Sequence, residues 1–184
     1  MKHLILSVLV TLPVIGLTVA QAHGLDAAAQ AKLDLKMKAV QTWAADASIV
    51  SAVKAHNAGL SAESAAMTQD KWKAAFVLDP FVRSFTKNPA ADFLKSKKTD
   101  ALSEVFLSGA DGTKVTFLGK TTYWSHKGKA KHDEPMAGKT WQGVVEVDES
   151  SDQRAIQIAV PVLDGDKPIG SLVAGFNITK LTAE

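Results

Sequence analysis

The spacing of apolar residues changes once along the chain, near Leu102. Before that point, apolar residues recur three and four positions apart, which is typical of amphipathic helices. After it, they alternate with other residues at every second position, which is typical of strands that bury one face. A chain that carries helices first and strands second is expected to pack helices against an antiparallel sheet. The sequence therefore predicts an α+β fold.

The helical part is predicted to begin with one long helix over residues 25–57. Its apolar positions are Leu33, Met37, Val40, Ala44, Ala47 and Val50. No proline interrupts this run, alanine is frequent, and Asn57-Ala58-Gly59 supplies a stop. Ser61 is expected to cap a second helix that ends near Ala75. Shorter helical or irregular pieces are expected to complete a helical part over residues 25–100.

The strand part is predicted to be a five-stranded antiparallel sheet over residues 102–181. The expected strands are 104–108, 114–118, 144–147, 154–162 and 168–178. Asp164-Gly165-Asp166 predicts a hairpin turn between the last two strands. Residues 120–142 are expected to form a loop.

The first 22 residues have the pattern of a secretory signal peptide. Met1-Lys2-His3 is a short basic start, residues 4–20 are almost wholly apolar, and Ala20-Gln21-Ala22 is a cleavage pattern. The alternative is an uncleaved membrane anchor, although the apolar run is shorter than the roughly 20 residues that span a bilayer. We expect a signal peptide over 1–22 and a single domain over 23–184.

The chain of 184 residues contains no cysteine. This excludes disulfides and metal sites built on thiolates. A secreted chain without disulfides must be held by its core, which favours a periplasmic location. The formal net charge of +2 indicates no strong attraction to nucleic acid, so no nucleic-acid partner is expected.

Several segments, taken in order, resemble the Cache family (PDC-type, PAS-like) of extracytoplasmic sensor domains. They are EVFLSGADGTKVTF, KTTYW, GVVEVDES and IQIAVPVLDGDKPIGSLVAGFNI. TWAADASIVSAVKAHN looks like the helix that precedes the family's sheet, and DKWKA at 70–74 resembles a stretch between the two. The resemblance covers roughly residues 33–181. It implies a PAS-like sheet with a pocket on one side for a small extracellular ligand.

The resemblance also implies how such a protein works. Cache domains usually belong to chemoreceptors, histidine kinases or cyclic-nucleotide enzymes, between two transmembrane helices. No second membrane helix is visible in this sequence, so we expect a stand-alone single-Cache sensor module without its own output domain. Its signal would pass to a membrane receptor or kinase, and two copies would pair through the long helix. The alternatives are an interaction protein whose pocket is filled by side chains, and a small periplasmic enzyme.

Five residues are predicted to contact the ligand: Tyr123, Trp124, Trp141, Gln157 and Asn177. Aromatic walls with a few placed polar groups suit a small organic molecule. The aromatic residues could equally fill the core, and Asn177 could equally bond its own backbone at a strand end. Gln157 is expected to face the pocket if the apolar face of its strand packs on the long helix.

An amino-acid ligand is not predicted. Cache domains that bind amino acids hold the ligand's carboxylate with an arginine in this loop and its amine with an aspartate on the last strand. Here Ser125-His126-Lys127 follows Trp124, and a neutral Asn177 stands on the last strand.

The segment HKGKAKHDE at 126–134 contains two histidines and two carboxylates. These are metal-ligand types, but the lysines among them would repel a cation and could instead favour an anionic ligand. We therefore predict no metal site and no cofactor. No catalytic motif is visible, so enzyme activity is not predicted.

Overall fold

The computed structural model describes residues 24–148 and 153–184. The predicted signal peptide and the centre of the acidic turn after Asp148 lie outside these residues. Helices occupy most of the first half of the chain. They are α2 (Ala27–Ala44), α3 (Ala47–Ala58), α4 (Ala62–Ala65), α5 (Gln69–Ala74), α6 (Pro80–Ser84) and α7 (Pro89–Ser96).

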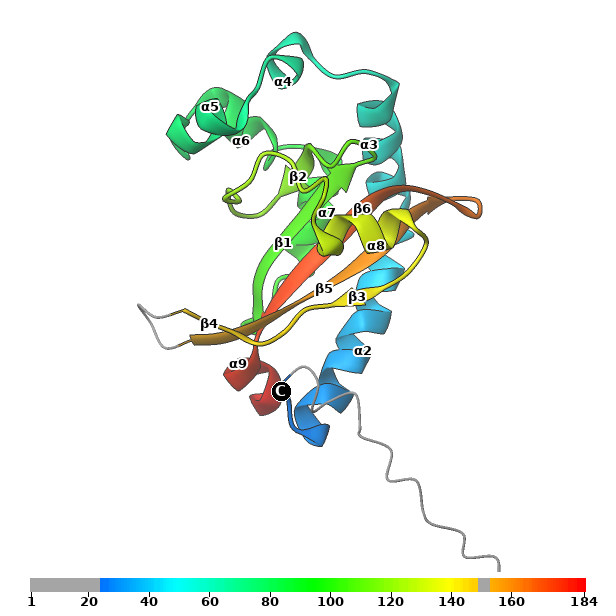
Figure 1. Cartoon of the computed structure of the whole chain (residues 1–184), viewed down its shortest axis with the longest axis vertical. Coiled ribbons are helices and arrows are strands. Elements are labelled where there is room, and N and C mark those ends of the chain that lie inside the picture. Colours follow the sequence, from blue (N-terminus) through cyan, green and yellow to red (C-terminus); the bar gives the residue numbers. More distant parts are fainter. Residues whose placement is uncertain (1–23, 149–152) are drawn as a thin grey trace, which may run out of the picture.

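The predicted single helix over 25–57 is wrong in one respect, because it is two helices. α2 ends before Ala45, and Asp46 has extended backbone geometry. The Asp46 carboxylate accepts hydrogen bonds from the backbone N–H of Ser48 at 2.8 Å and from its hydroxyl at 2.6 Å. An aspartate that caps a new helix in this way competes with continuation of the previous one. The two helices still follow one another along one edge of the molecule (Figure 1).

The second predicted helix is also divided. Ser61 caps α4 as expected, by accepting a hydrogen bond from the backbone N–H of Ser64, but α4 ends at Ala65. Thr68 then caps α5. α6 and α7 each begin with a capping side chain followed by proline, which suits the first helical position.

In the described part of the chain, the sheet has six antiparallel strands rather than the five predicted. They are β1 (Leu102–Gly109), β2 (Lys114–Phe117), β3 (Trp141–Gln142), β4 (Glu146–Asp148), β5 (Gln153–Asp164) and β6 (Lys167–Asn177). The strand order is β2-β1-β6-β5-β3, and β4 also pairs with β5. The helix-first α+β class is confirmed.

The predicted loop over 120–142 contains two elements that the sequence analysis missed. β3 pairs with Ala159 and Ile158 of β5, and helix α8 (Ala130–Met136) precedes it. The last hairpin turns where expected, with Gly165 in the left-handed region at φ +59°. A short helix, α9 (Ile178–Ala183), follows β6.

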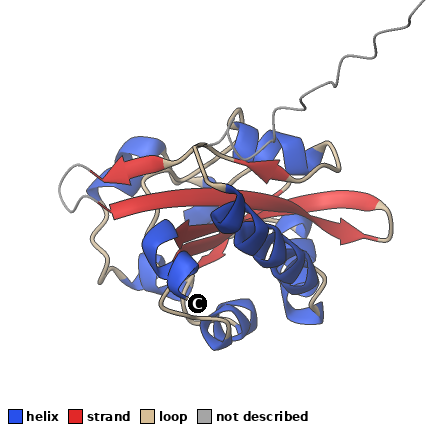
Figure 2. Cartoon of the chain, turned by 90° about the horizontal axis from the view of Figure 1, so that it is seen from below, coloured by secondary structure: helices blue, strands red, loops and turns tan. Residues whose placement is uncertain are grey.

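Helices α2 and α3 cover one face of the sheet (Figure 2). Leu33 and Val40 of α2 and Ile49 and Val53 of α3 join one buried cluster with the apolar side of β5. That side is formed by Ile156, Ile158, Val160 and Val162, as the alternation along this strand predicts. Gln157 and Ala159 therefore face the opposite side of the sheet.

The opposite face is covered by α8, α5 and α6, whereas α7 and α9 pack with α2 and α3. Figure 1 shows α8 in front of β5 and β6, with α2 behind them. Within residues 24–148 and 153–184, no helix has both the length and the apolar character that crossing a bilayer requires.

Candidate functional site

Buried polar side chains gather on the face of the sheet that α2 and α3 leave free. We call them the buried polar cluster: Ser108, Lys114, His126, His132 and Ser171. Each is less than 9% exposed. They come from β1, β2, the loop before α8, α8 itself and β6. Five polar side chains in the interior of a small domain form an arrangement that packing alone does not favour.

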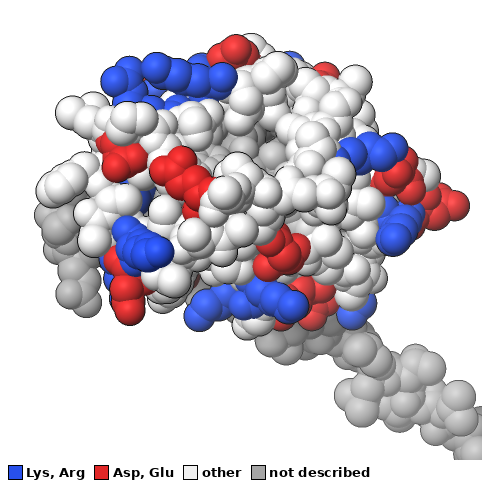
Figure 3. Space-filling view, turned by 90° about the horizontal axis from the view of Figure 1, so that it is seen from above, with Lys and Arg blue, Asp and Glu red and all other residues white. Residues whose placement is uncertain are grey.

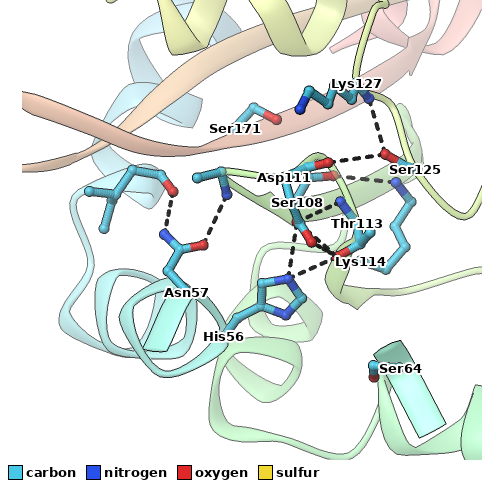
Figure 4. A network of polar contacts seen from close by, with 12 residues as sticks. His56, Asn57, Ser64, Ser108, Asp111, Thr113, Lys114, Ser125, Lys127 and Ser171 are labelled. Atoms are coloured by element: carbon cyan, nitrogen blue, oxygen red, sulfur yellow. Dashed lines mark hydrogen bonds and ion pairs between the residues drawn. The ribbon is translucent and has the colours of Figure 1, made fainter. Parts of the chain in front are cut away.

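Lys114 contacts three other side chains in this region. Its Nζ lies 3.3 Å from Ser108 Oγ and 2.5 Å from His126 Nδ1. It also lies 4.8 Å from the centre of the Phe106 ring. The bond to Ser108 crosses from β2 to β1, where these two residues are direct partners in the strand register (Figure 4). The lysine amine is thus held in place by groups that carry no negative charge.

The charge of Lys114 is strongly affected by this position. Burial, followed by the nearby charge of Lys131, lowers the pKa of Lys114 to about 7. The negative charges of Asp111 and Glu104 raise the pKa of Lys114, but by less than burial and Lys131 lower it. An amine with such a pKa is only partly protonated at neutral pH, and a nearby anion would favour its protonated form.

His126 is a neutral partner of this lysine. Its ring stacks on Phe106 at 4.6 Å between centroids, and its backbone N–H donates to the Gly112 carbonyl at 2.9 Å. Burial, followed by the charge of Lys114, lowers the pKa of His126 to about 3. The imidazole can therefore accept a hydrogen bond from Lys114 through Nδ1.

His132 joins the cluster from α8. Its Nδ1 lies 2.8 Å from Ser171 Oγ on β6, and Ser171 is the register partner of Ser108 on β1. The two serines thus place the contacts of Lys114 and His132 side by side on the sheet. Burial lowers the pKa of His132, against the opposing effects of a hydrogen bond to the Ala110 backbone and of Asp133.

A second polar chain lies on the same face of the sheet, nearer the other end of β5. Lys131 Nζ donates to the side-chain oxygen of Gln157, and the Gln157 amide donates to Glu104. Glu104 lies beside Gly175 of β6, where an added Cβ would be 2.7 Å from Glu104 Cγ. The absence of a side chain at Gly175 therefore makes room for this carboxylate.

A third group ties the edge of the site to α3. His56 Nε2 lies 2.9 Å from Thr113 Oγ1 and 3.3 Å from Asp111 Oδ1, and the Asp111 carbonyl accepts from Ser125 Oγ (Figure 4). Burial alone would raise the pKa of Asp111, but hydrogen bonds from His56 and Thr113 outweigh it and hold the pKa well below its usual range. The turn between β1 and β2 is thereby fixed against both α3 and the loop that carries His126.

An aromatic cluster adjoins the polar residues. It consists of Trp72, Phe81, Phe85, Phe117 and Trp124. The Trp124 ring lies 5.2 Å from Trp72 and 5.6 Å from Phe85, and Trp124 is only 5% exposed. The cluster anchors α5 and α6 to the sheet.

The structure places the five predicted ligand residues in different surroundings. Tyr123 is 42% exposed and meets His126 edge-on, with ring centroids 5.8 Å apart. Trp141 is half-buried on β3 and packs against the aromatic cluster. Gln157 belongs to the chain with Lys131 and Glu104. Tyr123, Trp141 and Gln157 thus lie on the same face as the buried polar cluster.

Asn177 and Trp124 are engaged in the structure of the domain. Asn177 accepts a hydrogen bond from the backbone N–H of Lys180, which caps α9, and donates to Gln153 at 3.1 Å. Trp124 lies inside the aromatic cluster, and its backbone N–H donates to Gln69 at 2.9 Å. A ligand contact at Asn177 would require its present bonds to open.

Sequence reasoning missed Lys114, Ser108, Ser171, Lys131 and Glu104. One signal was available, because a lysine and two serines stand at buried positions of predominantly apolar strands. His126 and His132 were considered only as metal ligands. Within residues 24–148 and 153–184, no group of three or more His, Asp or Glu side chains is placed to hold a metal ion.

No protein-family model matches the sequence, and a search of curated proteins found no match. Solved structures do show similarity. The ligand-binding domain of the Pseudomonas aeruginosa PAO1 chemoreceptor PctC, in complex with GABA, has a TM-score of 0.48 and 15% identity over 90% of this chain. The sensor domain of the V. cholerae histidine kinase DctB has a TM-score of 0.49 and 13% identity over 90% of this chain.

A third similar structure is the sensory domain of the Campylobacter jejuni chemoreceptor Tlp3 with isoleucine bound. Its TM-score is 0.41, with 15% identity over 85% of this chain. The chain spans 62%, 54% and 59% of the length of these three structures, respectively. All three are ligand-binding or sensor domains of chemoreceptors or of a histidine kinase.

Proposed function

We propose that this chain is a periplasmic sensor module of Cache type that binds a small anionic molecule over the buried polar cluster. The observation that carries the proposal is the position of Lys114, which is fully buried and contacts only neutral partners among the polar groups described above. Burying an amine in this way is costly unless a charge balances it. A ligand carboxylate or similar oxyanion would provide that charge.

The other donors of the site suit the same ligand chemistry. Lys131 supplies a second ammonium, and the hydroxyls of Ser108 and Ser171 can donate to an oxyanion. Tyr123, Trp141 and Gln157 are proposed to line the same site, and the neighbouring Trp124 is proposed to anchor this loop in the aromatic cluster. Asn177 remains a predicted contact whose present hydrogen bonds would have to be replaced.

Access to the cluster requires movement of α8. This helix lies between two glycines in the left-handed region, Gly128 at φ +81° and Gly138 at φ +80°. Such positions can absorb backbone rotation, so α8 is proposed to lift as the ligand enters. The resulting displacement, together with the sheet, would carry the signal.

The test is a thermal-shift screen of the purified protein against carboxylates, amino acids, inorganic phosphate and sulfate, with amines and purines as the uncharged or cationic comparison. A ligand at a hundredfold excess over its Kd stabilises the native state by about 2.7 kcal/mol, which corresponds to several degrees in Tm. We expect such a shift for one class of anion only. It should disappear in Lys114→Met and in Tyr123→Ala.

Lys54→Met is the matched control, because Lys54 is an exposed lysine paired with Asp164. This variant should respond to the ligand as the wild type does. A native far-UV circular dichroism spectrum for each variant would show that loss of binding is not loss of fold. A shift that persists in Lys114→Met would place the ligand elsewhere.

A second candidate is an interaction protein whose site is filled by its own side chains. It is favoured by one observation: in the described part of the chain, the buried side-chain nitrogen and oxygen atoms all have hydrogen-bond partners. The absence of any thermal shift across the library would support it. An enzyme is favoured less, since the Ser171 and His132 pair is fully covered.

The signal is proposed to reach a membrane receptor or kinase by docking, and two copies are proposed to pair through α2. Leu35 on this helix is 65% exposed, beside a surface hollow of about 340 Å³ lined also by Ala39 and Leu181. An apolar side chain next to a hollow is suited to reciprocal packing between two identical surfaces. Secretion by a signal peptide over residues 1–22 is part of the same proposal.

A further inference from the structure

Three consecutive apolar residues project into solvent between α5 and α6. Phe76 is 83% exposed, Val77 63% and Leu78 78%. Phe76 and Leu78 are the most exposed of the large apolar side chains in the described residues. Single exposed apolar residues are common, but three in a row at one projecting turn are typical of a surface that binds something. We call residues 76–78 the apolar turn.

The apolar turn is held in place on both sides. Trp72 before it and Phe81 after it are buried in the aromatic cluster. Within the turn, the backbone N–H of Asp79 donates to the Phe76 carbonyl at 3.0 Å, and the Asp79 carboxylate accepts from the backbone N–H of Phe81 at 2.8 Å. These contacts keep the three apolar side chains outside the core.

Cations outnumber carboxylates in the segment that carries the apolar turn. Between residues 69 and 87 the cations are Lys71, Lys73, Arg83 and Lys87, and the carboxylates are Asp70 and Asp79. Asp79 is already engaged as a helix cap. Lys120, from the loop after β2, lies over the Trp72 ring at 4.9 Å and adds a further cation.

A hollow lies beside the turn, between the apolar and the basic groups. It has a volume of about 270 Å³ and includes Val77, Leu78 and Phe117 in its wall. The charged residues that line it are Arg83 and Lys120. Figure 3 looks onto this end of the molecule and shows much uncharged surface, with Lys and Arg and also Asp and Glu side chains at several places around it.

We propose that the apolar turn and the cations around it dock the protein on an anionic phospholipid surface. The apolar side chains would enter the boundary between headgroups and acyl chains, while Arg83 and Lys120 would contact lipid phosphates. A projecting turn suits insertion into a bilayer, and the excess of cations complements its negative surface. The turn lies at the opposite end of the molecule from α9 and the start of α2 (Figure 1), so docking leaves that end accessible.

The test is co-sedimentation of the full chain with lipid vesicles. One set contains phosphatidylcholine alone, and the other contains about one third phosphatidylglycerol. We expect binding to the anionic vesicles that weakens when NaCl is raised to about 0.5 M, because salt screens exposed charges. Replacement of all three apolar residues, as Phe76→Ser, Val77→Ser and Leu78→Ser, should lower the partition coefficient at least about tenfold.

The charge variant Arg83→Gln/Lys120→Gln should lower binding about fivefold for each cation removed. Val144→Ser/Val147→Ser is the matched control, since these apolar residues are 60% and 52% exposed far from the turn. It should bind within about twofold of the wild type. All these side chains are exposed or half-exposed, and a melting curve for each variant verifies its fold.

Three results would overturn the proposal. They are no binding of the wild type to anionic vesicles, equal binding to neutral and anionic vesicles, and undiminished binding of the triple variant. The variants share the rest of the chain. If another part of the protein bound the vesicles, the triple variant would therefore bind them as well as the wild type does. An acidic protein partner, the other occupant that this surface could take, corresponds to the first of these results.

Discussion

At the scale of single residues, Lys114 stands out because its amine is buried without a negatively charged hydrogen-bond partner. It is fully buried on β2, and its hydrogen-bond partners Ser108 and His126 are neutral. A folded protein tolerates such a lysine when the amine can lose its proton or when a ligand supplies the missing charge. In both cases the protonation state of the lysine depends on the charges near it, which suits a residue at a binding site.

The stability of the protein should depend on pH through Lys114. Its pKa is about 7 in the folded state against 10.5 for an ordinary lysine. Between these values the unfolded chain binds a proton that the folded chain does not, so the free energy of unfolding rises with pH. We expect a rise of roughly 1 kcal/mol per pH unit between pH 7 and pH 9, measured by urea denaturation, and its loss in Lys114→Met.

Lys54→Met serves as the control for this slope, because it removes an exposed lysine rather than a buried one. His126 does not interfere, since its lowered pKa affects stability only below about pH 6.5. Equal slopes for the wild type and Lys114→Met above pH 7 would mean that the lysine is charged in the folded state.

At the scale of elements, the site depends on how closely β6 approaches β1 and α3. Gly170 on β6 is the register partner of Gly109 on β1. An added Cβ at Gly170 would lie 2.5 Å from the Ser108 carbonyl oxygen and 2.9 Å from Val53 Cγ1. Only a residue without a side chain allows this approach, which also brings Ser108 and Ser171 together.

Gly170→Ala should therefore destabilise the protein by about 1–3 kcal/mol, because a backbone atom must move to admit the methyl group. Gly119→Ala is the matched control, since nothing lies within 4 Å of its added Cβ. Urea denaturation of both variants measures the difference. A Gly170→Ala variant as stable as Gly119→Ala would show that the strands can separate at this point without cost.

At the scale of the whole molecule, the two faces of the sheet have different roles. α2 and α3 cover one face with an apolar core, and the other face carries the buried polar cluster and the aromatic cluster. The apolar turn and α9 lie at opposite ends (Figure 1). Under the proposed function, a change over the polar face would reach α2 through the single layer of strands between them.

Pairing of two copies through α2 is testable at this scale. Leu35→Glu would place a charge at the centre of the proposed contact and should convert a dimer into a monomer, as measured by light scattering coupled to size-exclusion chromatography. Val147→Glu is the control, because Val147 is also exposed but lies on β4. An unchanged mass for Leu35→Glu, or a monomeric wild type, would contradict pairing through this helix.

Local patterns in the sequence determined much of this fold. The change of period near Leu102 predicted helices followed by a sheet, and the alternation from Ile156 to Val162 predicted which side of β5 meets the helices. Asp164-Gly165-Asp166 predicted the last hairpin. These features were predictable because hydrophobic period and turn chemistry are set by neighbours in the chain.

The tertiary structure decided the break between α2 and α3, the strand β3 and the membership of the buried polar cluster. Asp46 could have remained on the surface of one continuous helix, and Trp141 needed a partner on β5 to form a strand. Lys114, His126 and Ser171 come from elements far apart in sequence, and only the register of β2, β1 and β6 brings them together. The local sequence around a residue does not predict such pairings, because they arise from long-range packing rather than from local preference.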